Sequence, residues 1–253
     1  MLVIGHRGAS GYAPENTLAA FDRALDLGAD GVETDVRLTR DGVLVLLHDD
    51  TVDRTTDGRG HIADLTWSEV QKLDAGGWYG ETYAGQRVPR LEELLDRYAG
   101  RLQLVLEIKA ADAAGPFVEL LQRRDLPNHP GLRMIGFSWP TVTLIAHALP
   151  RLATGYLTFH LNESLIKQLA ESPVREVWPE IAAIQPPLVE AAHTAGVKVG
   201  TWGIRSRADV ARAQDAGVDA ITLDYPEWTR PDNGNSAPSS LVLKKNPSKG
   251  GKT

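Results

Sequence analysis

The chain of 253 residues suits one large domain, and a domain of this size can bury a sizeable core without cross-links. It contains no cysteine, which excludes a disulfide framework, a thiolate metal site and a cysteine nucleophile. The formal net charge of −6 gives no general attraction to nucleic acid or to anionic membranes. An anionic substrate would have to be held by local cations or a bound metal, and we expect neither a nucleic-acid partner nor stable membrane association.

No apolar stretch of the sequence approaches the ~20 residues that a membrane-spanning helix requires. The first five residues enter an apolar run at once and lack the charged start of a signal peptide. These features predict a cytoplasmic protein. They leave its oligomeric state open.

Short apolar runs alternate with amphipathic stretches along the chain, which predicts strands alternating with helices. The expected strands cover residues 2–6, 31–36, 102–109, 133–138, 152–157, 182–185, 197–202 and 220–224. The expected helices cover residues 16–27, 91–98, 116–124, 140–149, 163–171, 187–195 and 206–216. Eight strands with seven intervening helices is the number for an α/β protein with a (β/α)8 TIM-type barrel, although a doubly wound open sheet would alternate similarly.

Residues at the ends of three expected helices fit these boundaries. Asn16 and Ser206 are of the type that caps helix N-termini. Gly28, Gly196 and Gly217 fall where helices should end, because glycine readily adopts the left-handed conformation found there.

A hairpin is expected after the second strand. Residues 36–49 contain no helical pattern, and Arg40-Asp41-Gly42 offers a tight turn between two apolar runs. A hairpin at this place would return His48 to the neighbourhood of Glu33 and Asp35.

The next segment, residues 50–90, is rich in Thr, Gly and Asp and holds one short helical pattern at 68–73. It is too long for an ordinary connection, so we interpret it as a small subdomain inserted after strand two. The sequence thus predicts a single barrel domain over residues 1–230. Residues 231–253 are polar and rich in Lys, Ser and Gly, which predicts a disordered C-terminal tail.

Three carboxylates lie at the ends of expected strands. Glu33 and Asp35 are two residues apart and so point to one face, as do Glu107 and Lys109 on the next barrel strand. In a barrel such strand ends meet at the functional face. Acids near strand ends are usually solvated loop residues, but a converging set would repel unless it bound a cation. All-oxygen ligation favours one divalent ion, Mg²⁺ or Ca²⁺, over zinc.

His6 and His48 form a candidate acid–base pair. Cleavage of a phosphodiester needs one proton taken from the nucleophile and another given to the leaving alkoxide, and histidine performs either role near neutrality. A single strand-end histidine is more often structural, and the chain contains five others: His61, His129, His147, His160 and His193. Of these five, only His160 follows an expected strand end closely enough to suggest a place in the pocket.

Arg7 and Lys109 are candidate ligands of phosphate oxygens, with ion pairs to the neighbouring acids as the alternative. Trp202, beside a strand end, is a candidate for the apolar wall of a substrate pocket. Trp78, Trp139 and Tyr156 are further aromatic candidates for that wall, although most aromatic residues simply pack in cores.

Taken in order, these residues and their neighbours resemble the glycerophosphodiester phosphodiesterase family. The similarity runs from residue 3 to about residue 226. The matching pieces are His6-Arg7-Gly8-Ala9, residues 14–17, 28–36 and 39–42, His48-Asp49, residues 54–56, 58–60, 88–94 and 106–109, Trp202, and residues 223–226.

The resemblance implies a barrel with an inserted subdomain. It implies that Glu33, Asp35 and Glu107 are ligands of one divalent ion. It also implies that His6 and His48 are the acid–base pair and that Arg7 and Lys109 bind the phosphate. The implied reaction is hydrolysis of a glycerophosphodiester to sn-glycerol 3-phosphate and an alcohol. Attack by the glycerol 2-hydroxyl through a cyclic phosphate and direct attack by water both remain open.

Two departures from the family pattern lie where the alcohol portion of the substrate would sit. Phe137-Ser138 replaces the usual Ser-Phe, and Trp202-Gly203-Ile204-Arg205 replaces Trp-Thr-Val-Asn. The alternative function is therefore a related barrel phosphodiesterase acting on a lysophospholipid, a sphingophospholipid or a sugar phosphodiester. An acyl chain would require an apolar mouth, supplied by Trp139, Phe159 and Trp202.

Two alternatives from other classes explain less of the sequence. A catalytically silent phosphate-binding barrel would have no need for the full set of chemical residues. A glycosidase using Glu33 and Asp35 would leave both histidines and both cations unexplained, and neighbours on one strand are poorly placed to flank a sugar bond.

Overall fold

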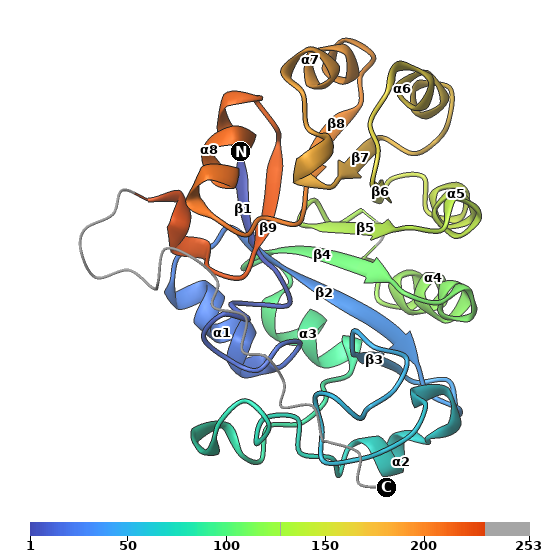
Figure 1. Ribbon diagram of the computed structural model, residues 1–253. Helices are drawn as coiled ribbons and strands as arrows, with labels where there is room; N and C mark the ends of the chain where they lie inside the picture. Colours follow the sequence, from blue (N-terminus) through green and yellow to red (C-terminus); the bar gives the residue numbers. More distant parts are fainter. Residues whose placement is uncertain (127, 231–253) are drawn as a thin grey trace, which may run out of the picture.

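The computed structural model describes residues 1–126 and 128–230. Within them, eight parallel strands form a closed barrel in the order β1-β9-β8-β7-β6-β5-β4-β2, and β1 pairs with β2 to complete it (Figure 1). The barrel strands are β1 (Leu2–Gly5), β2 (Gly31–Leu38), β4 (Gln103–Ile108), β5 (Leu132–Gly136), β6 (Ala153–Thr158), β7 (Glu176–Pro179), β8 (Lys198–Thr201) and β9 (Ala220–Leu223). The predicted (β/α)8 TIM-type barrel is confirmed, and the open sheet is excluded.

Helices pack around the outside of the barrel (Figure 1). They are α1 (Leu18–Asp26), α3 (Leu91–Tyr98), α4 (Ala114–Arg123), α5 (Trp139–Ala148), α6 (Glu163–Ala170), α7 (Pro186–Thr194) and α8 (Arg207–Asp215). The main hydrophobic core lies between these helices and the strands, with fully buried residues such as Phe21, Phe117 and Leu104. This packing fixes the strand ends that carry the functional side chains.

A separate apolar cluster fills the inside of the barrel. Trp178 on β7 is its largest member and is 1 % exposed. Its indole fits only because two neighbouring strands carry glycine: a Cβ on Gly155 or on Gly200 would lie 2.6 Å or 2.3 Å from the ring. The Trp178 Nε1 donates to Glu176 Oε2 at 3.0 Å, so the buried donor has a partner.

The sixth barrel strand is Glu176–Pro179, and the expectation of a strand at residues 182–185 was wrong. The apolar residues 181–183 instead form a 3-10 turn after the strand. The strand is only four residues long, begins with a charged residue and ends in proline, which conceals it in the hydrophobic pattern. Glu176 is nevertheless buried, because it faces the barrel interior beside Trp178.

The cap residues named from the sequence agree with the structure except at one position, although several helices begin or end one to three residues from the expected bounds. Ser206 caps α8 by accepting from the Asp209 N–H, and Gly28, Gly196 and Gly217 follow their helices with φ between 70° and 75°. Thr17, not Asn16, caps α1. Asn16 is buried with a φ of 58°, and its side chain is committed to the β2 residues Thr34 and Asp35.

The expected hairpin is present, since β3 (Leu44–Leu46) pairs antiparallel with β2. It is followed by α2 (Trp67–Val70), short 3-10 turns and irregular chain, drawn in blue-green in Figure 1. This inserted segment packs a small apolar cluster of its own against the hairpin, formed by Val45, Leu47, Val52, Ile62, Val70, Ala75 and Val88. Its designation as a subdomain stays a prediction, and the predicted tail, residues 231–253, lies outside the described residues.

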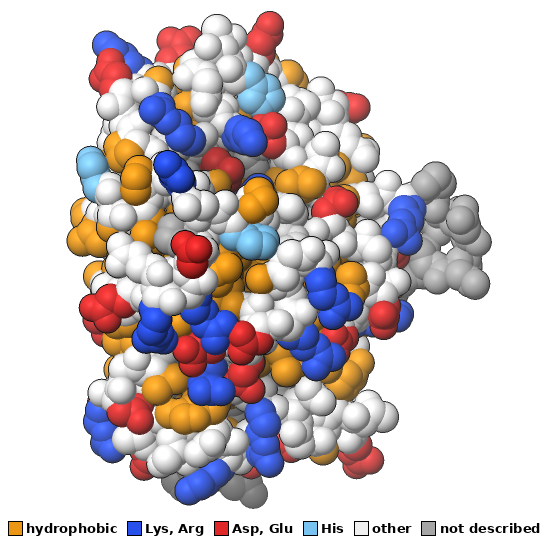
Figure 2. Space-filling view, turned by 180° about the vertical axis from the view of Figure 1, so that it is seen from behind, with side chains coloured by type: hydrophobic (Ala, Val, Ile, Leu, Met, Phe, Trp, Pro, Cys, Tyr) orange, Lys and Arg blue, Asp and Glu red, His pale blue; other side chains and the backbone are white. Residues whose placement is uncertain are grey.

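The surface gives two findings that bear on partners. Over the part of the chain that the structure describes, none of the helices is long and apolar enough to cross a membrane. Figure 2 shows acidic and basic side chains interspersed on the face that it displays, so that face carries no large patch of a single charge.

Candidate active site

Three buried carboxylates converge at the carboxyl end of the barrel. Glu33 and Asp35 lie two residues apart on β2, and Glu107 on β4 is the register partner of Asp35. One oxygen from each carboxylate lies within 4.8 Å of the others, and the residues are at most 8 % exposed. Three hard oxygen donors at this spacing fit Mg²⁺ or Ca²⁺, which would relieve the repulsion among them.

The pKa values of the three carboxyl groups reflect the repulsion among them. Burial and the charge of Asp35 raise the pKa of Glu33 to about 8. The same two causes raise the pKa of Glu107. Burial also disfavours the charged form of Asp35, but Arg7 and Lys109 outweigh it and hold the pKa of Asp35 below its usual range. Without a divalent cation, protons would thus occupy part of the cluster near neutral pH, and cation binding would displace them.

Lys109 lies immediately after β4 and leans over the cluster. Its Nζ is 2.8 Å from Glu107 Oε1 and 3.5 Å from Asp35 Oδ1. The side chain is only 14 % exposed, so these contacts are little screened by water. A single ammonium group therefore offsets part of the charge of two carboxylates while remaining at the pocket surface.

Arg7 approaches the cluster from the loop after β1. Its Nε lies 3.2 Å from Asp35 Oδ2, and its Nη1 donates to Glu15 Oε1 at 2.7 Å. The backbone of Arg7 has a φ of 53°, and its N–H donates to Glu33 Oε2 at 3.0 Å. The left-handed turn therefore directs both the backbone donor and the guanidinium of one residue at the two β2 carboxylates.

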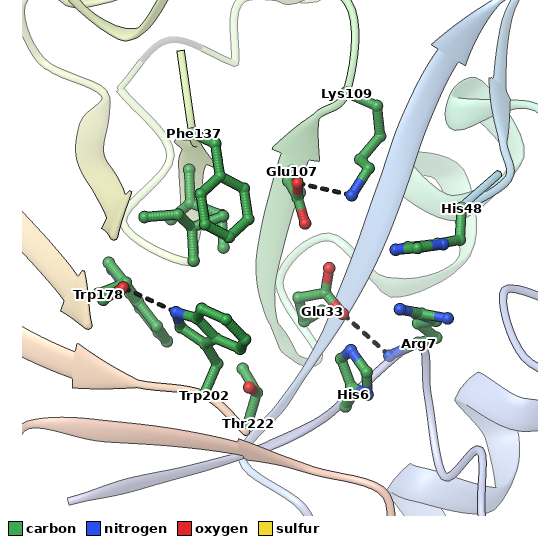
Figure 3. A pocket seen from close by; sticks show the side chains of 12 residues that line it. His6, Arg7, Glu33, His48, Glu107, Lys109, Phe137, Trp178, Trp202 and Thr222 are labelled. Carbon is green, nitrogen blue, oxygen red and sulfur yellow. Dashed lines mark hydrogen bonds and ion pairs between the residues drawn. The ribbon is translucent and has the colours of Figure 1, made fainter. Parts of the chain in front are cut away.

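Each of two histidines in the site has a carboxylate partner. His6 Nδ1 lies 2.7 Å from Asp224 Oδ1, and His48 Nδ1 lies 2.8 Å from Asp49 Oδ1. A carboxylate at Nδ1 favours a proton on that nitrogen and leaves Nε2 available for proton transfer. Figure 3 shows the two imidazoles beside Arg7, on the same side of the pocket.

The environments of the two histidines shift their pKa values in opposite directions. Burial opposes the charged form of His6, but the hydrogen bond and charge of Asp224 outweigh it and raise the pKa above 6.5. Burial lowers the pKa of His48 below 6.5, and Arg7 adds to this effect. Two titratable groups with separated pKa values are suited to act as an acid and a base at one pH.

These groups line a pocket of about 110 Å³ with two chemically different sides (Figure 3). The charged side is formed by His6, Arg7, Glu33, His48, Glu107 and Lys109. The apolar side comes from the opposite half of the barrel and is formed by Ile135, Phe137, Leu157, Trp178 and Trp202. The pocket can thus hold an anion at one side and a hydrocarbon portion at the other.

Three aromatic rings form the rim of the apolar side. Phe137 stacks on Phe159 at a centroid distance of 5.5 Å, and Trp202 meets these two rings edge-on at 5.6 and 5.2 Å. Phe137 is 40 % and Phe159 is 56 % exposed, although both are large hydrophobic residues. We call these three residues the aromatic rim.

The sequence profile described as the glycerophosphoryl diester phosphodiesterase family matches residues 6–228, which includes every charged residue of the pocket. The chain belongs to this family. The resemblance inferred from the motifs is therefore confirmed, together with the barrel that it implied.

Individual members of the phosphodiesterase family are similar over nearly their whole length. A glycerophosphodiester phosphodiesterase from Caldanaerobacter subterraneus subsp. tengcongensis is 39 % identical, over 89 % of this chain and 95 % of the relative. A glycerophosphodiester phosphodiesterase from Bacillus subtilis is 31 % identical, over 90 % and 84 %. The solved structure of an Oleispira antarctica phosphodiesterase in complex with the product sn-glycerol-3-phosphate is 32 % identical, covers 90 % of this chain and 95 % of its own, and has a TM-score of 0.81.

In this phosphodiesterase fold, the eight residues singled out from the sequence come together. Seven of them line the pocket, namely His6, Arg7, Glu33, His48, Glu107, Lys109 and Trp202. The eighth, Asp35, completes the carboxylate cluster behind them.

Four other sequence candidates lie away from the pocket. Trp139 and Tyr156 pack edge-on against each other at 5.2 Å in the layer between strands and helices, so they do not form the apolar wall. Trp78 packs on Tyr79 in the inserted segment. The exposed His160 is not among the residues that line the pocket.

Sequence reasoning missed the residues that support the site. Asp224 follows β9 and could have been found by the same strand-end argument that selected the three acids. Asp49 and Glu15 stood within the matched motifs, next to selected residues, but had no evident partner in the sequence. Phe137, which departs from the family pattern, lines the pocket in the structure, and Ser138 caps α5 by accepting from the Thr141 N–H.

Proposed function

We propose that the chain is a divalent-metal-dependent hydrolase that converts glycerophosphodiesters to sn-glycerol 3-phosphate and an alcohol. The observation that carries this proposal is the meeting of three carboxylates, two histidines and two cations at one barrel mouth. The related Oleispira antarctica structure, which holds sn-glycerol-3-phosphate, supports the product class. Glu33, Asp35 and Glu107 would hold the cation.

The chain's own residues provide the proton transfers. His48, neutral because of its lowered pKa, takes the proton from the attacking hydroxyl or water. A phosphorus–oxygen bond forms at the nucleophile, and the bond to the alcohol breaks. Where the glycerol 2-hydroxyl attacks, the resulting cyclic phosphate is then opened by water to sn-glycerol 3-phosphate. His6, whose raised pKa favours the protonated form, gives its proton to the departing alkoxide.

The remaining charged groups bind the phosphate. Arg7 and Lys109 bind its non-bridging oxygens and offset the charge that accumulates on them in the transition state. Glu33, Asp35 and Glu107 would hold a divalent cation, which would supply Lewis-acid polarisation of the phosphate. Because Lys109 and Arg7 also contact the cluster, the same residues place the phosphate next to the histidines.

The test is release of sn-glycerol 3-phosphate from glycerophosphocholine after EDTA treatment and again after addition of Mg²⁺ or Ca²⁺. We expect release only with an added cation. His48→Ala should lower the rate by roughly 10²–10⁴-fold, whereas His147→Ala, on the outside of α5, should not. Absence of product with both ions would contradict this substrate class.

A second candidate substrate is a lysophospholipid cleaved by the same residues. The aromatic rim favours it, because exposed Phe137 and Phe159 offer an apolar surface at the pocket mouth that a small polar alcohol does not need. The centroids of the three rings lie 5.2–5.6 Å apart, so the rings pack against one another. They therefore present a continuous apolar surface instead of a cage around a cation. An acyl chain lying on this surface would shield it from water.

This candidate is tested by comparing kcat/KM for lysophosphatidylcholine micelles and glycerophosphocholine. If acyl chains bind the rim, Phe159→Ser should lower the lysophosphatidylcholine value about 10-fold relative to that for glycerophosphocholine. Leu144, on α5, is also an exposed hydrophobic residue but does not belong to the aromatic rim. Leu144→Ser is therefore the matched control and should change neither value. An unchanged ratio in Phe159→Ser would remove lysophospholipids as the substrate class.

A further inference from the structure

Arg54, in the inserted segment, joins two carboxylates that come from different parts of the barrel. Its Nε and Nη2 donate to Asp49 Oδ2 and Oδ1 at 2.6 and 3.1 Å. Its Nη1 and Nη2 donate to Glu15 Oε2 and Oε1 at 2.7 and 2.9 Å. The planar guanidinium therefore donates two hydrogen bonds to each carboxylate, a geometry that lysine cannot reproduce.

These two carboxylates are bound to residues of the active site. Asp49 Oδ1 lies 2.8 Å from His48 Nδ1, and Glu15 Oε1 accepts from Arg7 Nη1 at 2.7 Å. A continuous series of charge-assisted contacts thus runs from Arg7 through Glu15, Arg54 and Asp49 to His48. Arg54 itself is not among the residues that line the pocket.

The charges in this series hold one another in their ionised forms. The hydrogen bonds from Arg54 lower the pKa of Asp49, and the contact with Glu15 raises the pKa of Arg54. The pKa of Glu15 is also lowered, because Arg54 and Arg7 outweigh its burial. Without Arg54, Asp49 would keep only His48 as a side-chain partner among the described residues, and its carboxylate could rotate about the side-chain bonds.

We propose that Arg54 is a positioning residue, which fixes the Asp49 carboxylate and through it the imidazole of His48. The inference rests on the proposed function in one respect, namely that His48 transfers a proton. Glu15 serves as the anchor that ties Arg54 to the loop before α1. The inserted segment thereby takes part in catalysis without touching the substrate.

An ordinary surface ion pair is the competing explanation, since such pairs contribute about 0–1 kcal/mol to stability and nothing to turnover. Arg59 of the same segment forms an ion pair of that kind with Asp53. The Arg59 side chain is 72 % exposed, and its Nε lies 3.9 Å from Asp53 Oδ1. Arg59→Met is therefore the matched control for Arg54→Met. The control should leave kcat unchanged.

The kinetic test compares kcat and KM for Arg54→Met and Arg54→Lys, with circular dichroism to verify folding. We expect Arg54→Met to lower kcat 10- to 100-fold while KM changes less than about threefold, because misplacement of a catalytic group by ~1 Å can cost ~10²-fold. Arg54→Lys should recover part of this loss. Wild-type kcat in Arg54→Met would overturn the proposal.

A double-mutant cycle shows whether the effect passes through His48. In a His48→Ala background, adding Arg54→Met should lower the remaining rate by less than about twofold. In a His6→Ala background, the full 10- to 100-fold loss should persist. Equal losses in both backgrounds would indicate general disruption of the site and would overturn the proposal.

A measurement without turnover separates this inference from the proposed reaction. In NMR spectra of the imidazole groups, the Nδ1–H signal of His48 should shift or broaden in Arg54→Met and stay unchanged in Arg59→Met. Arg54→Lys provides the same comparison if the methionine variant does not fold. An unchanged His48 signal would overturn the positioning role, whereas a changed signal in an enzyme inactive on every phosphodiester would leave that role standing and contradict only the proposed function.

Discussion

Asp35 and Glu107 occupy directly paired positions on β2 and β4, and Lys109 Nζ lies within 3.5 Å of a carboxylate oxygen of each. The pairing of adjacent parallel strands thus places two acids side by side at the functional face of the barrel. Lys109 contacts one oxygen of each, and the other oxygen of Asp35, Oδ2, accepts from Asn16 Nδ2 at 2.8 Å and lies 3.2 Å from Arg7 Nε. A cation held by Glu33, Asp35 and Glu107 would therefore share the carboxylate oxygens with Lys109, Arg7 and Asn16.

Removal of one carboxylate tests the metal site. We expect Glu107→Gln to keep the fold but to weaken activation by Mg²⁺ or Ca²⁺ by at least about 10-fold, because an amide oxygen is a poorer ligand than a carboxylate. The measurement is initial rate against cation concentration, with circular dichroism as the check on folding. Full activity at limiting cation would remove Glu107 from the set of ligands.

Lys109→Met tests the role of the lysine in phosphate binding. The variant keeps an unbranched side chain but loses the charge that would stabilise the transition state, so kcat/KM should fall on the order of 10²-fold. Lys72→Met, at an exposed position of the inserted segment, is the control. If kcat/KM does not change, Lys109 forms only a structural ion pair with Glu107 and Asp35.

The opposite pKa shifts of the two histidines predict a bell-shaped dependence of kcat/KM on pH. His48 must be neutral to act as a base, and its pKa lies below 6.5, so activity should rise with pH on that side. His6 must be protonated to act as an acid, and its pKa lies above 6.5, so activity should fall on the other side. In His6→Ala the residual activity should lose the alkaline limb; loss of the acid limb instead would reverse the two assignments.

The raised pKa of Glu33 predicts how stability depends on pH when no divalent cation is bound. Between its ordinary value of 4.5 and about 8, the folded protein binds this proton more tightly than the unfolded chain does. The contribution of Glu33 to stability therefore decreases as pH rises through this range and is constant above it. Thermal unfolding in EDTA at pH 5.5 and pH 8.5 measures the effect, with Glu33→Gln as the variant that should lack this component.

The sequence predicted the barrel because most of its strands are continuous apolar runs with distinct helices between them. It failed at β7, where a charged start and a terminal proline hide a short buried strand. The packing of Trp178 in this strand depends on the space that Gly155 and Gly200 leave around its indole, and these glycines lie about twenty positions away in either direction. Such a three-dimensional arrangement has no local signal.

The same distinction applies to the site. Glu33, Asp35 and Glu107 could be predicted because strand alternation and strand ends are local properties. The pairing of His6 with Asp224 joins residues 218 positions apart, and only closure of the barrel between β1 and β9 brings them together. The local sequence predicts Asn16 as a helix cap, whereas its buried side chain donates a hydrogen bond to Asp35 on β2.

Trp178 closes the interior of the barrel below the pocket. The indole and its apolar neighbours occupy the interior, and the pocket lies above them with Phe137 and Trp202 of the aromatic rim in its wall. For the proposed diester substrate, the phosphate would lie at the charged side of the pocket and the alcohol portion at the aromatic rim. Changes in the alcohol would then be felt at the rim and not at the charged groups, so one unchanged reaction centre would serve different leaving groups.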